Sequence, residues 1–262
     1  MRLGISNDAR PQATTLLIAS AISLVLYFVP YVSAVTYPFQ IFVTFIHEGG
    51  HAIATLLTGN SVASLSVAAD TSGLTYHSVG GVWAQMFISS AGYLGAMGFG
   101  ALLLVLIRHR VKARVILIGS AAIIATLTLI FGIFKPILTM SFLSAIPFTV
   151  FAGVVISAGL IAIAKFATPR VASFFVGLLA VQCVLNALLN LKDVFLLSTP
   201  FAPAVHNDAM NMAHATGIPA IFWTIFWIAI AFGMLWFVMR LYVVSRDSST
   251  QPDLPFEDAP AV

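Results

Sequence analysis

Long apolar runs separated by short polar segments cover most of the chain. A helix that crosses a membrane needs about 20 mainly apolar residues, and seven stretches approach or exceed that length. They are residues 13–32, 35–57, 79–107, 115–134, 146–164, 171–198 and 218–239. This pattern predicts an all-α, polytopic membrane bundle of about seven spans, contained in a single domain over residues 1–245.

The composition agrees with a membrane protein. Hydrophobic residues make up 60% of the chain and charged residues 8%, with a mean hydropathy of +1.02, whereas soluble domains carry about 25% charged residues. Residues 246–262 are polar, acidic and proline-containing, so we expect a disordered tail there. The single cysteine, Cys183, lies in an apolar run and is interpreted as a core residue, which excludes a disulfide framework and a thiolate metal site.

The basic residues lie in short clusters between the apolar runs, so they indicate membrane topology and not a nucleic-acid surface. With seven spans, one side of the membrane collects Arg108, Arg110, Lys112, Arg114, Lys165, Arg170, Arg240 and Arg246. The positive-inside rule predicts that this side is cytoplasmic. The amino terminus, with Arg2 and Arg10, would then lie on the opposite side, which conflicts with the same rule.

Residues 42–57, FVTFIHEGGHAIATLL, place three ionisable side chains inside an apolar run. A charged side chain at the bilayer centre costs about 2.5–3.5 kcal/mol on insertion scales, so such residues face a partner or a wet cavity. His47 and His51 are four residues apart, and therefore project from one helix face at a spacing at which both can bind one metal ion. Glu48, next to the first histidine, can act as general base toward a zinc-activated water. The pattern His-Glu-x-x-His thus indicates hydrolysis of an acyl bond.

The same stretch resembles the site-2 proteases, the intramembrane zinc metallopeptidases, and more closely a branch of small bacterial membrane proteins. The resemblance continues through residues 69–81 (ADTSGLTYHSVGG), 90–100 (SAGYLGAMGFG) and 207–219 (NDAMNMAHATGIP). It implies Zn²⁺ as cofactor and a short β-hairpin or re-entrant segment after the zinc helix. Residues 61–79 fit such a hairpin, because they are rich in Ser, Val and Thr with turn residues at 70–73, although composition alone fits a polar loop equally well.

A catalytic zinc site needs three protein ligands, and the third is not given by the resemblance. The Asn-Pro…Leu-Asp-Gly motif of the better-known members is missing, as is a PDZ or CBS-like domain. Asp193 is the preferred third ligand, because Asn186, Asn190 and Asp193 form a polar stripe expected to face the bundle interior.

Two other aspartates remain as alternatives to Asp193. Asp208 resembles the Ser-Asp-Ala element of the small family, although Asn207 or Asp208 could equally cap a short helix ended by Gly217. Asp70 is most simply a turn former. His206 and His214, which flank Asp208, are interpreted as surface residues.

The sequence therefore predicts a zinc metalloendopeptidase that cuts transmembrane or membrane-proximal segments of other membrane proteins, in the bacterial inner membrane. Its partners would be that substrate and the lipid bilayer, with no nucleic acid. Two alternatives stay open: a transporter of zinc or another divalent metal, and a pseudoprotease that binds membrane clients without cutting them. A transporter needs a second intramembrane ligand set, and an intact Glu48 argues against a pseudoprotease.

Overall fold

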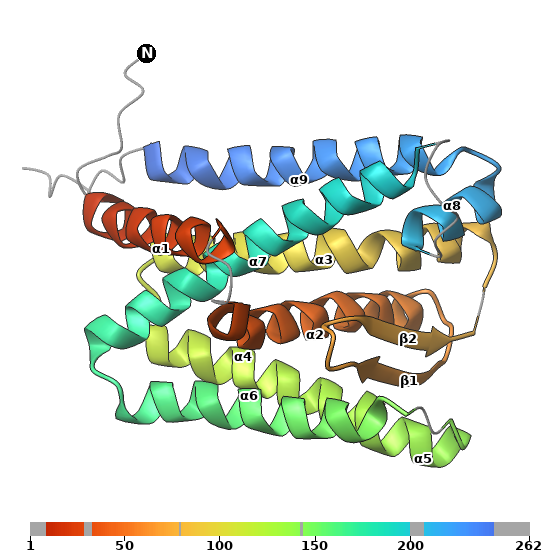
Figure 1. Cartoon of the computed structure of the whole chain (residues 1–262), viewed down its shortest axis with the longest axis horizontal. Coiled ribbons are helices and arrows are strands. Elements are labelled where there is room, and N and C mark those ends of the chain that lie inside the picture. Colours follow the sequence, from red (N-terminus) through yellow and green to blue (C-terminus); the bar gives the residue numbers. More distant parts are fainter. Residues whose placement is uncertain (1–8, 29–32, 79, 142–143, 200–206, 244–262) are drawn as a thin grey trace, which may run out of the picture.

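The computed structural model describes residues 9–28, 33–78, 80–141, 144–199 and 207–243, and it confirms a helical bundle with one small sheet (Figure 1). The predicted tail at 246–262 and His206 lie outside the described residues. In chain order the elements are α1 (Arg10–Phe28), α2 (Ser33–Leu57), β1 (Val62–Val67), β2 (Gly73–His77), α3 (Val82–Arg108), α4 (Ala113–Leu127), η2 (Thr128–Phe134), α5 (Lys135–Thr139), α6 (Ile146–Phe166), α7 (Pro169–Leu197), α8 (Asp208–Thr216) and α9 (Ala220–Val243).

Five helical segments of the described chain are long and apolar enough to cross a membrane. They are α3, the continuous segment Ala113–Thr139 formed by α4, η2 and α5, and then α6, α7 and α9. The expectation of about seven spans is therefore not confirmed, although α1 and α2 make the other two predicted stretches helical. In α2 the polar residues Gln40, His47, Glu48 and His51 interrupt the apolar run.

Helix α1 begins at the end of the bundle where α3 ends and where α4 and α7 begin, which we call the basic end. Gln12 lines one cavity with Arg110 and the first turns of α7, and further along α1 the hydroxyl of Ser23 accepts a hydrogen bond from Gln182 of α7 (3.3 Å). Helix α1 therefore runs in the same direction as α7. Arg10, at the start of α1, lies with the other basic residues, which corrects the opposite placement expected from the sequence.

Helix α2 also runs away from the basic end. Its Phe42 ring contacts Phe99 (centroids 5.8 Å apart), and Gly50 further along contacts Ala91, so α2 is antiparallel to α3. The chain from Phe28 to Ser33 reaches at most about 18 Å, less than the roughly 30 Å of a hydrocarbon core. Two consecutive helices of the same direction cannot both be complete spans with so short a connection, and neither α1 nor α2 is among the five segments long and apolar enough to cross a membrane.

The hairpin expected after the zinc helix is present at the other end of the bundle, which we call the hairpin end (Figure 1). Strands β1 and β2 pair antiparallel. Asp70 forms the turn, as predicted, because its Oδ1 accepts hydrogen bonds from the Ser72 amide (3.0 Å) and hydroxyl (2.6 Å). The Tyr37 hydroxyl of α2 donates to the Ala69 carbonyl (2.8 Å), which ties the turn to the helix.

A π-helical segment, η2, lies between α4 and α5. The Lys135 amide at its end donates to the carbonyl of Ile130, five residues back. Such segments occur mostly as local insertions within α-helices. Beyond η2 the chain contacts strand β1, where the Thr139 hydroxyl donates to the carbonyl of Ala63 (3.1 Å). The segment therefore connects the helical layer to the hairpin.

Glycines allow α2 and α3 to pack backbone against backbone. A Cβ atom on Gly50 would collide with the carbonyl group of Ala91. A Cβ atom on Gly49, which faces α4, would lie 2.6 Å from Leu127 Cδ1. Close approach through small residues is the usual basis of helix association in membranes, where apolar burial gives little net driving force.

We expect Gly50→Ala to lower the thermal unfolding midpoint of the purified protein. Alanine is the better helix former by about 1 kcal/mol, but overpacking against a backbone typically costs about 1–3 kcal/mol. Gly98→Ala on α3 is the matched control, because a Cβ atom there meets nothing within 4 Å. A Gly50→Ala midpoint equal to or above that of Gly98→Ala would contradict this account of the α2–α3 contact.

Candidate metal centre and its cavity

The two predicted histidines converge on one point beside α3. Both project from α2, and their Nε2 atoms lie 3.1 Å apart. The Nδ1 atom of His51 hydrogen-bonds to the carbonyl of Ile88 on α3 (2.7 Å). A carbonyl can only accept, so Nδ1 carries a proton, and in the neutral ring this leaves the lone pair on Nε2. Metal-ligating histidines are commonly oriented in this way.

Asp208 brings a carboxylate oxygen to the same point. Its Oδ2 lies 3.4 Å from His47 Nε2 and 3.3 Å from His51 Nε2. We call these three atoms the ligand triangle. Bonds of about 2.0–2.1 Å in a tetrahedral zinc site place neighbouring ligand atoms about 3.3 Å apart. The triangle therefore has the dimensions of three ligands around one ion.

Asp208 is the first residue of helix α8, and the start of this helix fixes its position. Asn207 is the N-cap, and its side-chain oxygen accepts the Met210 amide hydrogen (3.0 Å), while Gly217 ends the helix with a positive φ of 73°. The predicted cap is thus Asn207, which leaves the Asp208 carboxylate available to the triangle. Burial alone would raise the pKa of Asp208, but His51 and His47 outweigh it and hold that pKa well below its ordinary value.

Glu48 lies beside the triangle and is 5% exposed. Ligand atoms of His47, Glu48 and His51 all lie within 4.8 Å of one another. The hydroxyl of Thr75 on β2 donates to Glu48 Oε2 (2.7 Å), and a Cβ atom on Gly73 would lie 2.5 Å from Oε1. Strand β2 therefore holds one carboxylate oxygen by a hydrogen bond and packs closely against the other at Gly73, where only a glycine leaves room.

Gly92 and Tyr93 on α3 enclose the histidines from the other side. A Cβ atom on Gly92 would lie 2.5 Å from the Nε2 atoms of both His47 and His51. The Tyr93 ring packs edge-on against His47, with centroids 4.6 Å apart. Residues Thr75, Gly92 and Tyr93 were not singled out individually from the sequence. Two features of the sequence point to them. The buried Glu48 needs a hydrogen-bond donor, which Thr75 provides, and the glycine-rich block at 90–100 contains Gly92 and Tyr93.

A cavity of about 700 Å³ opens in front of the triangle. Besides the site residues named above, it is lined by all five residues of β2 and by polar residues of α3 and α8. Alternate residues of a strand point to opposite faces. A strand that lines a cavity with every residue must therefore present its edge there. Within the described part of the chain, β2 pairs with β1 and with no other strand.

The structure places Asp193 away from this site. Its side chain is 58% exposed, and its Oδ1 lies 2.8 Å from the Lys192 ammonium. Asn190 is also exposed, and Asn186 donates to Gln182 of its own helix (2.8 Å to the carbonyl). The stripe does not face the bundle interior as a unit, so the geometry favours Asp208 over Asp193, the reverse of the preference drawn from the sequence.

The remaining sequence candidates lie outside the triangle. Asp70 serves the hairpin turn. His214 is exposed, as predicted, and lies on the rim of the cavity. The buried Cys183 lies among the core residues, in agreement with its predicted role.

Comparison with known proteins gives one family. The model of a family described as peptidase M50B-like matches residues 17–238. This region includes the histidine pair, the hairpin and α8. No curated protein and no solved structure matches the chain significantly.

We expect Gly92→Ala to weaken metal binding at least tenfold, because the new methyl group would displace both Nε2 atoms of the triangle. Metal content after a fixed chelator challenge is the measurement. Gly98→Ala, six residues further along α3, where a Cβ atom meets nothing within 4 Å, should retain the metal. Equal retention in the two variants, both folded by thermal unfolding, would contradict the close contact between Gly92 and the histidines.

Proposed function

The chain belongs to the peptidase M50B-like family of membrane metallopeptidases, and from this premise we propose that it is a zinc-dependent endopeptidase that cuts membrane-embedded segments of other proteins. The observation that carries the proposal is the ligand triangle beside a buried, hydrogen-bonded Glu48 in a cavity large enough for a peptide. The five apolar helices make the chain an integral membrane protein. We propose the bacterial inner membrane as its location.

We propose His47, His51 and Asp208 as the three zinc ligands. Two imidazole nitrogens and one carboxylate oxygen are a donor set that suits zinc, and all three side chains line the cavity. A zinc ion bound there would supply Lewis-acid chemistry, by lowering the pKa of a water ligand toward about 7 and polarising a carbonyl oxygen. Asp208 would also neutralise part of the ion's charge, which matters in a poorly hydrated site.

Glu48 is the proposed general base. Its carboxylate takes a proton from the attacking water and passes that proton to the amide nitrogen that leaves. Thr75 holds one carboxylate oxygen, so the other, near Gly73, is the oxygen positioned for proton transfer. The role assigned to Thr75 is orientation of Glu48, because its own hydroxyl hydrogen is already donated.

The edge of β2 that no other described strand pairs with supports a substrate that binds in extended form. A peptide bond within a helix is hydrogen-bonded and shielded, so a transmembrane substrate must unwind locally before it is cut. Backbone groups freed by unwinding need partners in a membrane, and an open strand edge beside the cavity offers them. We therefore propose a membrane protein as substrate and β2 as the element that receives it.

Replacement of the proposed base is the central test. We expect Glu48→Gln to retain zinc and fold but to lose cleavage of transmembrane peptides by about 10²- to 10⁴-fold, the usual contribution of a positioned general base. Asp70→Asn, a comparable change at the exposed turn carboxylate, should cleave at the wild-type rate.

Cleavage by Glu48→Gln at the wild-type rate would exclude the proposed mechanism. Absence of cleavage in the wild type, together with zinc flux across vesicles, would instead favour the transporter. Client binding without either activity would favour the pseudoprotease.

The third ligand is tested by a matched pair of variants. We expect Asp208→Asn to lose most zinc under a fixed chelator challenge, because two remaining ligands bind weakly. Asp193→Asn should keep its zinc, since that side chain lies in an exposed pair with Lys192. The opposite result would restore the assignment first drawn from the sequence and would require α7 to change its position relative to α2.

A further inference from the structure

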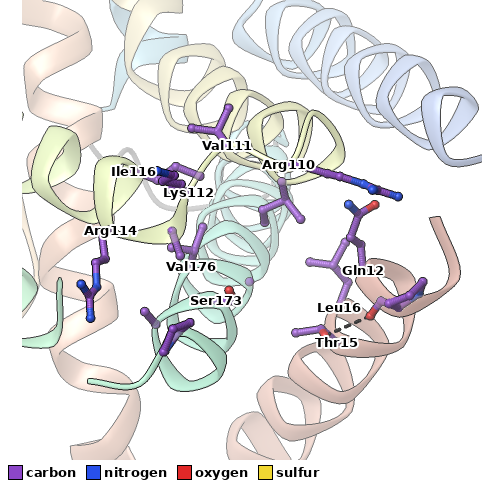
Figure 2. A pocket seen from close by; sticks show the side chains of 16 residues that line it. Gln12, Thr15, Leu16, Arg110, Val111, Lys112, Arg114, Ile116, Ser173 and Val176 are labelled. Atoms are coloured by element: carbon purple, nitrogen blue, oxygen red, sulfur yellow. Dashed lines mark hydrogen bonds between the residues drawn. The ribbon is translucent and has the colours of Figure 1, made fainter. Parts of the chain in front are cut away.

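A second cavity, of about 570 Å³, lies at the basic end between α1, α3, α4 and α7 (Figure 2). It does not share residues with the cavity at the metal centre. Ile107, on its wall, is 15 residues beyond Gly92 on α3, or about 22 Å along the helix. The two cavities therefore lie at different depths of the bundle, and nothing proposed above for catalysis uses the second one.

Three cationic side chains of the α3–α4 connection line this cavity: Arg110, Lys112 and Arg114. Figure 2 shows Arg110 extending over Gln12 of α1, whereas Arg114 lies on the other side of the opening. None of the described residues that line the cavity is acidic. The cavity therefore has the charge that suits an anion.

The position and the walls restrict what kind of anion fits. The connection follows α3 and precedes α4, both in segments able to cross the membrane, so the cations lie at a membrane surface. The walls below them are largely apolar and include Leu16, Ile116 and Val176. A ligand that combines a phosphate with hydrocarbon chains matches both parts.

The side chain of Gln12 indicates that the ligand also carries a hydrogen-bond donor. Its side-chain oxygen is buried and has no hydrogen-bond partner among the described residues, and Gln12 lines the same cavity. A buried acceptor without a donor costs roughly 1–3 kcal/mol. A hydroxyl group of a lipid headgroup would donate to this oxygen and remove that cost.

We propose that this cavity binds one anionic phospholipid with a hydroxyl-bearing headgroup, of the phosphatidylglycerol class. Its phosphate lies beside Arg110, while Lys112 and Arg114 add positive charge around the opening. Its headgroup hydroxyl donates to Gln12, and its acyl chains follow the apolar walls between α1 and α7. Basic pockets between helices at a membrane surface are suited to such headgroups. The bound lipid would join α1 to the α3–α4 connection.

The test counts phospholipids bound to the delipidated full chain by native mass spectrometry in mild detergent, with phosphatidylglycerol or phosphatidylcholine added. One variant replaces Arg110, Lys112 and Arg114 with Gln. Its control replaces Lys165, Arg170 and Arg240 with Gln, which removes the same charge at the same end of the bundle from residues that do not line the cavity. A third variant, Ser173→Phe, keeps every cation and fills part of the cavity.

We expect the wild type and the control triple to hold one phosphatidylglycerol with similar affinity, and the cavity triple to bind it on the order of 100-fold more weakly, at about fivefold per cation. Ser173→Phe should also weaken binding, and phosphatidylcholine should bind weakly to all variants. An equal loss in both triples would show general surface attraction and overturn the proposal.

Two further experiments test whether a different anion, inorganic phosphate or the acidic tail of the chain, occupies the cavity. Displacement of the lipid by inorganic phosphate at equal concentration would mean a site for free phosphate and overturn the proposal. A chain ended at Ser245 lacks the acidic residues 246–262. If only that shorter chain binds phosphatidylglycerol, the tail is the occupant and the proposal is wrong; unchanged binding supports it.

Discussion

The contact between the backbones of α2 and α3 is the constraint on which the candidate metal centre depends. Gly50 lies against Ala91, and Gly92 lies against the two histidine rings. At this separation the carbonyl of Ile88 can receive the Nδ1 hydrogen of His51, so α3 both packs against the imidazoles and sets the direction of their lone pairs. A side chain larger than hydrogen at either glycine would separate the helices and move the Nε2 atoms apart. The same close helix contact is therefore needed both for packing and for the position of the histidine nitrogens.

The side chains that complete the site around the two histidines and Glu48 come from short elements that do not span the membrane. Asp208 lies on the nine-residue helix α8, and Thr75 lies on β2. Short elements at the end of a bundle can bring polar side chains to a buried point without a charged residue in the middle of a long apolar helix. This arrangement limits the cost of burial to residues that have partners, since Glu48 and Asp208 each lie within contact distance of a donor or a histidine.

The sequence was sufficient for those parts of the site that depend on local spacing. The positions of His47, Glu48 and His51 follow from helical periodicity, and the hairpin follows from turn residues such as Asp70. The third ligand depends on which distant elements meet in space, and local spacing carries no such information. Asp193 was preferred because it lies in an apolar helix, yet its neighbour Lys192 gives it a partner at the surface.

The expected number of spans also depends on information that local patterns do not carry. An apolar run shows that a helix can enter the membrane, but not where along the bundle that helix begins or which way it runs. The direction of α1 is visible only from its contacts with α7, such as the pair Ser23 and Gln182. Once α1 and α2 are known to run the same way, Arg10 joins the other cations at the basic end and the conflict with the positive-inside rule disappears.

The π-helical segment η2 allows one helix to satisfy two partners whose registers differ. Before it, α4 packs on α6 and α7; after it, α5 packs on β1. In a regular α-helix each residue turns the chain by about 100°, so removing one residue from Thr128–Phe134 would rotate everything that follows by about that angle. Thr139 would then point away from Ala63, and the hairpin would lose its outer support. The segment thus sets the rotational register of the residues that follow it. Because Thr139 must meet β1, the number of residues in this helix cannot change by even one without loss of that contact.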